Sequence, residues 1–143
     1  MTALLKSLRL ALVAALVALA APALAGDKVV YHIDDAGVQA TKALRNIRNH
    51  LDTAPDTKVT VVTHADGVDF LFDGAKDPKS GAEYAPLISG LKANGVAFEV
   101  CEITMKRRNL TREKFVMDAD FTPSGVVRLT ELQARDHFAY IKP

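Results

Sequence analysis

The sequence predicts an α/β fold with a mostly parallel five-stranded sheet, because apolar runs typical of strands alternate with segments of helical periodicity. The strand-like runs are short, rich in β-branched residues and almost continuously apolar, which is typical of strands buried on both faces of a parallel sheet. Their order along the chain, β-α-β-α-β-α-β-α-β, favours a doubly wound sheet with right-handed crossovers. The 143 residues have the length of a single domain.

The first half of the predicted fold holds two strands and the helix between them. Strands are expected at residues 28–33 (KVVYHI) and 58–63 (KVTVVT). Between them, residues 37–52 carry apolar side chains at helical spacing along one face, namely Ala40, Leu44, Ile47 and Leu51. Asp34 or Asp35 is expected to cap this helix, since aspartate oxygens accept hydrogen bonds from the free amides of the first turn.

A second helix and a third strand are predicted in the middle of the chain. Residues 73–81 have the composition of an exposed turn. The helix that follows is indicated by apolar residues at i, i+3, i+4 and i+7, namely Tyr84, Leu87, Ile88 and Leu91. We expect it to end at Asn94-Gly95, where a left-handed residue stops a helix, and to lead into a strand at residues 96–101 (VAFEVC).

The last third of the chain is expected to add two helices and two strands. A short helix is predicted near residues 111–117 and a brief strand near residues 119–122. A longer helix is predicted at residues 124–135, with three residues facing inward: Val126, Leu129 and Leu132. Residues 138–141 are expected to form the final strand.

The first 25 residues have the three-part layout of a cleavable secretory signal. Lys6 and Arg9 give a basic start, residues 10–21 form an unbroken apolar run, and Ala23-Leu24-Ala25 offers small residues for cleavage after Ala25. The expected mature domain, residues 26–143, is therefore periplasmic or otherwise exported, and no second apolar span predicts a membrane helix. An uncleaved signal anchor is the alternative.

Composition excludes several classes of protein. A chain that is 49% hydrophobic and 24% charged is not intrinsically disordered. The formal charge of +1, without a block of like charges, gives no footprint for nucleic acid. The single cysteine excludes an intrachain disulfide framework and a multi-cysteine zinc site. No glycine-rich phosphate loop is present, so no nucleotide cofactor is predicted.

Three chemically active side chains fall at the carboxyl ends of predicted strands, where open parallel sheets place their ligands. His32 lies near the end of the first strand, His64 follows the second, and Cys101 closes the third. If the first strand lies between the other two, all three ends share one edge of the sheet. The sequence therefore predicts a site at this edge.

Cys101 is the principal candidate in this site. If a helix begins after it, the free amides of the first turn favour a thiolate, as do the cations that follow: Lys106, Arg107 and Arg108. Glu99 and Glu102 act in the opposite direction. The alternative is that Cys101 is a small buried apolar residue, which is common for a free cysteine.

The histidines have two interpretations each. His64 is a candidate base or orienting group for Cys101, and its alternative is a turn cap. His32 is a candidate binding residue, and its alternative is a satisfied interior side chain. A metal site made of these two histidines and Cys101 is not predicted, because the chain has no local ligand pair such as His-x-His.

Several segments, in order, resemble the DsrE/DsrF-like (YchN-like) family. They are NIRNHL at 46–51, VVTH ending at His64, GVAFEVC at 95–101, PSGV at 123–126, LQ at 132–133 and AYIKP at 139–143. The resemblance implies a flavodoxin-like three-layer α/β/α sandwich that assembles into a homotrimer or homohexamer. It also implies a persulfide on one cysteine, which matches Cys101 followed by Arg107 and Arg108. Asn109 and His137 stand where the family usually has glycine, and the relays known in the family are cytoplasmic.

Two classes of function follow from these observations. The first is an exported sulfur carrier or sulfurtransferase that holds a persulfide on Cys101 and exchanges sulfur with donor and acceptor proteins. The alternative is a non-catalytic oligomeric module that binds a small ligand or partner and in which Cys101 is structural; a thiol redox sensor is a third reading. For assembly, the apolar run 70–72 is expected either to cover a neighbouring subunit or to pack internally as a helical turn.

Overall fold

A computed structural model describes residues 26–143, so the predicted signal sequence lies outside the described residues. Its centre is a sheet of five parallel strands in the order β4-β3-β2-β1-β5. The strands are β1 (Lys28–Asp35), β2 (Lys58–Asp66), β3 (Ala97–Cys101), β4 (Ala119–Thr122) and β5 (Ala139–Ile141). The predicted α/β fold with a five-stranded parallel sheet is confirmed.

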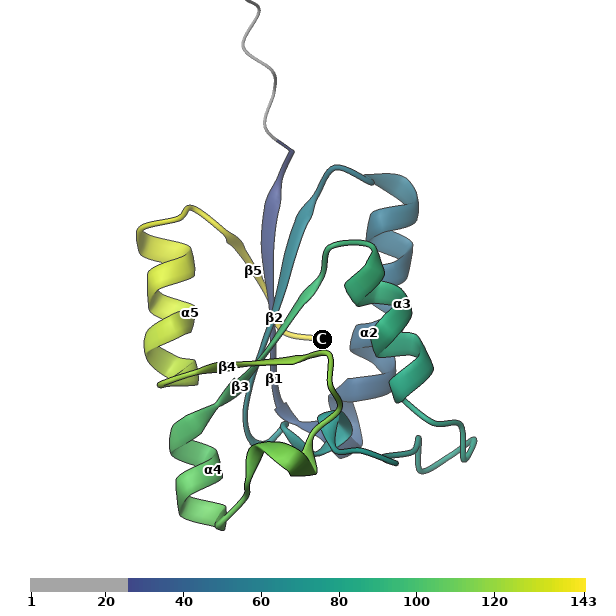
Figure 1. The fold of residues 1–143 in the computed structure, drawn as a ribbon. Coiled ribbons are helices and arrows are strands. Elements are labelled where there is room, and N and C mark those ends of the chain that lie inside the picture. Colours follow the sequence, from purple (N-terminus) through teal and green to yellow (C-terminus); the bar gives the residue numbers. More distant parts are fainter. Residues whose placement is uncertain (1–25) are drawn as a thin grey trace, which may run out of the picture.

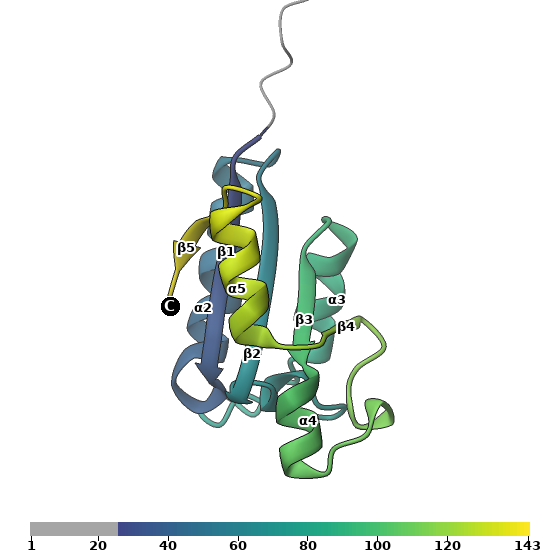
Figure 2. The ribbon, with the colours of Figure 1, turned by 90° about the vertical axis from the view of Figure 1, so that its left-hand side faces the viewer.

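Helices cover both faces of this sheet and make a three-layer sandwich (Figure 1). On one face lie α2 (Ala36–Thr53) and α3 (Ala85–Ala93), and on the other lies α5 (Gly125–Ala134). The short helix α4 (Glu102–Arg108) extends beyond the carboxyl edge of the sheet, below the start of α5 (Figure 2). Within residues 26–143, none of the helices has both the length and the apolar character needed to cross a membrane.

The strand order differs from the expected one in a way that matters for the site. The three strand ends were expected to share one edge if β1 lay between β2 and β3, but β2 lies between β1 and β3. The sheet therefore grows outward from β1 through β2, β3 and β4 in chain order, and only β5 returns to the other side of β1. The three strand ends of interest are still neighbours, with His64 in the centre.

The face covered by α2 and α3 holds the larger core. The helix α2 begins as predicted at Asp35, whose carboxylate accepts a hydrogen bond from the Val38 amide at 3.2 Å. Fully buried side chains on this face include Ile33 and Val61 from the sheet, Ile47 from α2, Ile88 from α3 and Phe98 from β3. This face is almost wholly apolar.

The face covered by α5 holds a small core with polar neighbours. Its buried apolar residues are Val30, Val62, Leu129, Leu132 and Phe138. Beside them Glu99 of β3 accepts two hydrogen bonds from Arg128 of α5, at 2.8 and 3.0 Å. The paired carboxylate and guanidinium thus add to this small apolar cluster in holding α5 to the sheet.

One predicted helix is misplaced in the sequence. Residues 111–117 contain only the 3-10 turn Arg112–Lys114, because Phe115 forms an isolated bridge with Phe72 and the Val116 amide donates to the Leu71 carbonyl. The helix is instead α4. It has few apolar residues for a periodicity to detect, but an acidic first turn and a basic last turn match the helix dipole.

The structure also decides where two apolar segments lie, namely Val126 and the run 70–72. Val126 was expected to face inward but is 61% exposed, because Gly125, Leu129 and Leu132 form the buried face of α5 and Val126 lies beside that face. Phe70 and Leu71 are buried in the 3-10 turn Asp69–Leu71, while Phe72 packs against Phe115. Of the two expectations for this run, internal packing is therefore the correct one.

Asn109 and His137, which stand where the resembled family usually has glycine, both adopt left-handed backbone conformations. Their φ angles are 53° and 60°. Left-handed φ is strained for residues with a β-carbon and free of strain for glycine. The usual glycine at these two positions thus has a direct conformational reason.

Candidate functional site

The strand register brings His32, His64 and Cys101 onto the face of the sheet that α5 covers. His32 is paired with Val62 in β2, and His64 lies two residues further along that strand. Because Thr63 is paired with Val100, the next pair along the two strands is His64 and Cys101. Side chains at paired positions in a sheet point to the same face. The three residues therefore follow one another across neighbouring strand ends, as the sequence predicted.

Cys101 lies where two helices begin. It is the residue before the first turn of α4, and it is also next to Gly125, the first residue of α5. A β-carbon placed on Gly125 would lie 3.3 Å from the β-carbons of both Cys101 and His64. Gly125 thus allows the start of α5 to approach closely, and its own amide reaches the cysteine sulfur.

These surroundings lower the pKa of the Cys101 thiol. Burial acts to raise it, since only 4% of the residue is exposed, but hydrogen bonds from the Gly125 amide, from Thr104 and from the Ile103 amide outweigh burial. Thr104 contributes its hydroxyl as well as its amide. The Thr104 oxygen accepts from the Ala65 amide at 3.0 Å, so its proton is free to point at the sulfur.

The two histidines are in direct contact. The Nε2 atoms of His32 and His64 are 2.7 Å apart, and the Nδ1 atom of His32 is 2.6 Å from the hydroxyl of Tyr140 in β5. Burial, together with the charges of His64 and Lys142 and against the effect of Asp34, lowers the pKa of His32 to about 4. Burial also lowers the pKa of His64, against the effect of Asp34. Both rings are therefore neutral at pH 7.

A pocket of about 420 Å³ opens over Cys101 and His64. Ile103 and Val126 contribute apolar walls, while Arg107 and Arg108 contribute charge. Arg108 is paired with Asp69 at 2.6 Å and also contacts the Ala65 carbonyl at 3.1 Å. Within the described part of the chain Arg107 has no ion-pair partner, so its charge is available to an anion in this pocket.

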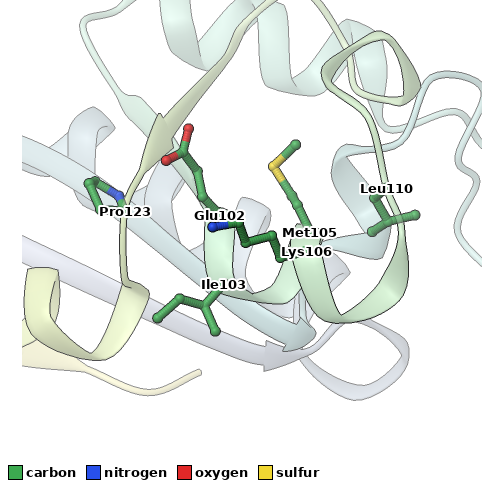
Figure 3. A pocket seen from close by; sticks show the side chains of 6 residues that line it. All are labelled: Glu102, Ile103, Met105, Lys106, Leu110 and Pro123. Atoms are coloured by element: carbon green, nitrogen blue, oxygen red, sulfur yellow. The ribbon is translucent and has the colours of Figure 1, made fainter.

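Lys106 belongs to a different hollow. A second pocket of about 420 Å³ lies beside α4 and β4, lined by Glu102, Ile103, Met105, Lys106, Leu110 and Pro123 (Figure 3). Of the three consecutive cations, only Arg107 and Arg108 thus line the Cys101 pocket. Since successive helical residues point in different directions, a run of three cations on a helix does not face one site.

Sequence reasoning missed four contributors to the site: Thr104, Gly125, Tyr140 and the ion pair of Glu99 with Arg128. Gly125 had a local signal, because Ser124-Gly125 follows a strand and opens a helix, and Ser124 caps that helix. Tyr140 had none, because its contact with His32 depends on β5 returning beside β1 across 108 residues of sequence. Among residues 26–143, no group of three or more His, Cys, Asp or Glu side chains is placed to hold a metal ion.

Comparison with known proteins identifies one family and several similar solved structures, among them the following two. The structure of MTH1491 from Methanobacterium thermoautotrophicum, a protein of unknown function, has a TM-score of 0.71 and 26% identity over 82% of this chain and 99% of its own. The ychN protein from E. coli has a TM-score of 0.68 and 15% identity over the same shares of the two chains, which supports the fold. No curated protein matches the chain. The model of the DsrE/DsrF-like family matches residues 6–143, and the chain therefore belongs to the DsrE/DsrF-like family.

Proposed function

We propose that this protein is an exported sulfur carrier of sulfurtransferase type that holds one sulfur atom as a persulfide on Cys101. The observation that carries the proposal is the cysteine itself, placed at the floor of a pocket and hydrogen-bonded by the amides at the starts of α4 and α5. Amides that stabilise a thiolate also stabilise a persulfide anion, because in both the charge is on sulfur. The DsrE/DsrF-like family membership is consistent with this role.

The loading reaction transfers a sulfur atom without net oxidation. The Cys101 thiolate attacks the outer sulfur of a donor persulfide, the sulfur–sulfur bond of the donor breaks, and the donor leaves as a thiolate. The new sulfur–sulfur bond is on Cys101. The proton first held by the Cys101 thiol goes to solvent, and the donor thiolate takes up a proton from solvent. An acceptor thiolate removes the sulfur by the same exchange in reverse.

The pocket walls suit a small anionic or thiol-bearing donor. Arg107 supplies a positive charge that no described acidic side chain neutralises, and Arg108 is already engaged by Asp66 and Asp69. Arg107 is therefore assigned the binding of the anionic donor. The thiol pKa depends on the amides and on Thr104, so Arg107→Ala should weaken loading by an anionic donor more than it changes the alkylation of Cys101 by a neutral reagent.

Intact mass after sulfur loading tests the proposal. The reduced mature chain is incubated with inorganic polysulfide, which loses one sulfur atom to the protein and becomes one atom shorter. We expect the mass to rise by one sulfur atom and to return to its starting value with excess dithiothreitol. Cys101→Ser is the matched control and should gain nothing. Equal masses for the two proteins would refute the proposal.

The non-catalytic module is supported by one observation, the burial of Cys101. In that case the same pocket would bind a ligand and the thiol would be protected from reagents. Alkylation of the folded protein distinguishes the two functions, since a persulfide site needs an accessible sulfur. A thiol that iodoacetamide modifies only after unfolding would favour the module.

Export is part of the proposal and has its own test. The chain is expected to lose residues 1–25 when a bacterial host secretes it, so that the mature protein begins at Gly26. N-terminal sequencing of the purified product checks this expectation. A product that retains residues 1–25 would contradict cleavage.

We also propose the homotrimer or homohexamer that the family resemblance implies. Ile103, Val126 and Val127 are exposed apolar side chains at or beside the mouth of the Cys101 pocket, which favours an interface there. Light scattering on the mature protein should give the mass of three or six chains. Val127→Asp should reduce that mass, while Val38→Asp, at an exposed site on α2, should not. The mass of a single chain for the unmodified protein would contradict assembly.

A further inference from the structure

The His32–His64 contact continues a line of side chains across three strands. Tyr140 is paired with Val30 in the register of β1 and β5, and His32 lies two residues beyond Val30 on the same face. In the same way, His64 lies two residues beyond Val62, the partner of His32. Each contact is therefore a diagonal step between neighbouring strands, and the line runs from β5 through β1 to β2.

We propose that Tyr140, His32 and His64 form a proton-transfer chain that connects the Cys101 pocket to solvent at the β5 edge of the sheet. This inference rests on the proposed function, because it assigns the route by which the Cys101 proton leaves during sulfur loading. The two ends of the chain are placed for that role. His64 lines the pocket together with Cys101, and Tyr140 is 43% exposed at the other end.

Each of the two hydrogen bonds in this chain, His64 to His32 and His32 to Tyr140, contains one hydrogen. Two ring nitrogens 2.7 Å apart share a single hydrogen, so one imidazole donates and the other accepts. The neutral His32 ring then has the opposite role toward the Tyr140 hydroxyl, 2.6 Å away. The His64 Nδ1 atom makes no hydrogen bond to the described protein, and no described buried side-chain nitrogen or oxygen lacks a partner. The Nδ1 atom is therefore open to solvent or to a group in the pocket.

The transfer conserves protons at every step. The thiol proton passes to Nδ1 of His64 while the hydrogen on its Nε2 atom moves to Nε2 of His32. The hydrogen on Nδ1 of His32 moves to the Tyr140 oxygen, and the original hydroxyl proton of Tyr140 goes to water. The result is a thiolate in the pocket, two neutral imidazoles and a neutral tyrosine, so no cation is left in the buried part of the chain.

The charged groups around the two rings are paired with one another, so they do not hold a proton on either histidine. Lys142 donates to Asp34 at 2.5 Å, and these two groups act on His32 in opposite directions. On the side of α5, Glu99 is already paired with Arg128. Burial lowers the pKa of both histidines, which keeps them neutral at pH 7 and able to pass a proton in either direction. His64 is thus the ring that shares the pocket with the thiol, and His32 and Tyr140 act through it as positioning residues.

The test is the pH profile of sulfur loading of Cys101 by inorganic polysulfide in Tyr140→Phe. The chain is needed only where the thiol is protonated, so the variant should load about tenfold or more slowly below the thiol pKa and converge with the unmodified protein above it. Tyr31→Phe is the matched control, because Tyr31 lies on the opposite face and bonds His50 at 3.2 Å. Its profile should equal that of the unmodified protein.

A second readout reports the hydrogens directly. Nitrogen NMR of the histidine rings should show the coupling expected for an N–H···N bond between His32 and His64, and Tyr140→Phe should change the tautomer populations of both rings. Wild-type loading together with an unchanged pH profile in Tyr140→Phe and in His32→Gln would overturn the chain, as would the absence of that coupling. Failure of the unmodified protein to load sulfur would instead overturn the proposed function.

Discussion

The two faces of the sheet show a division of labour between stability and chemistry. On one face α2 and α3 enclose a large apolar core in which Ile47, Ile88 and Phe98 are fully buried. On the other face α5 covers a small apolar cluster, and next to it lie His32, His64, Glu99 and Cys101. The comparison teaches that one well-packed face allows the other to hold polar groups that cost stability.

The largest expected effect is on the free energy of unfolding. Ile47→Ala removes a fully buried side chain from the large core and should cost about 4 kcal/mol. Leu129→Ala removes a side chain that is 7% exposed in the small cluster and should cost about 2 kcal/mol. Urea unfolding of the two variants measures both values. Equal losses in the free energy of unfolding, or a larger loss in Leu129→Ala, would contradict the proposal that the α2–α3 face contributes more to stability.

The polar face should also make stability depend on pH. The pKa of His32 is lowered to about 4 in the folded protein, below that of an unfolded histidine near about 6.5. As the pH falls from about 6.5 toward 4, the unfolded chain binds a proton that the folded chain does not, so stability is complete above this window and falls within it. The expected loss is on the order of 1–3 kcal/mol.

Urea unfolding at several pH values measures this dependence. His32→Gln removes the titrating ring, so its stability should fall less between pH 6.5 and 4 than that of the unmodified protein. The same slope in both proteins would show that His32 is not held neutral by the fold.

Substitution of one glycine on each face, Gly90 in α3 and Gly125 in α5, should give smaller and different effects on the two faces. Gly90 lies within α3 with nothing within 4 Å of an added β-carbon, so Gly90→Ala should stabilise the protein by about 0.5–1 kcal/mol. Gly125→Ala would press on Cys101 and His64 at 3.3 Å, and should raise the pKa of the thiol by moving the Gly125 amide away. Thermal unfolding and thiol alkylation measure the two effects. An unchanged thiol pKa in Gly125→Ala would show that the Gly125 amide does not lower the pKa of Cys101.

The smallest expected effect concerns backbone strain at left-handed positions. Left-handed residues with side chains occur at Ala65, Asn109 and His137, whereas the loops leading into α3 and β3 use Gly74, Gly81 and Gly95 for such angles. His137→Gly should therefore stabilise the protein by about 0.5 kcal/mol. Gly95→Ala, the opposite change on the other side, should destabilise it. A loss of stability in His137→Gly would contradict the strain argument.

Features of the structure that have a local pattern in the sequence were predicted, and features without such a pattern were missed. The β-branched runs and the spacing in α2 and α3 were sufficient for the fold, and strand ends were sufficient to select His32, His64 and Cys101. The helix α4 was missed because residues 102–108 have few apolar side chains, and its evidence was the order of charges. Val126 was misplaced because the buried face of α5 runs through Gly125, Leu129 and Leu132, and a glycine gives no apolar signal at the first of these positions.

The strand order and the contacts across strands had no local signal. Nothing near Tyr140 indicates that it meets His32, and nothing near Gly125 indicates that its amide meets Cys101. The first contact depends on β5 pairing with β1, and the second depends on β4, which leads into α5, pairing with β3. Sequence reasoning therefore selected Cys101 but not the groups that surround it.

The proposed reactivity of Cys101 depends on the hydrogen bonds that its sulfur receives at the starts of α4 and α5. The most direct measurement is the rate of alkylation of the folded protein by iodoacetamide as a function of pH, with Thr104→Val as the variant that removes the hydroxyl donor. We expect the midpoint of the alkylation rate against pH to lie below the ordinary pKa range of a cysteine thiol. In Thr104→Val we expect this midpoint to be higher. A midpoint in or above the ordinary range, or a thiol that reacts only after unfolding, would contradict the proposed reactivity.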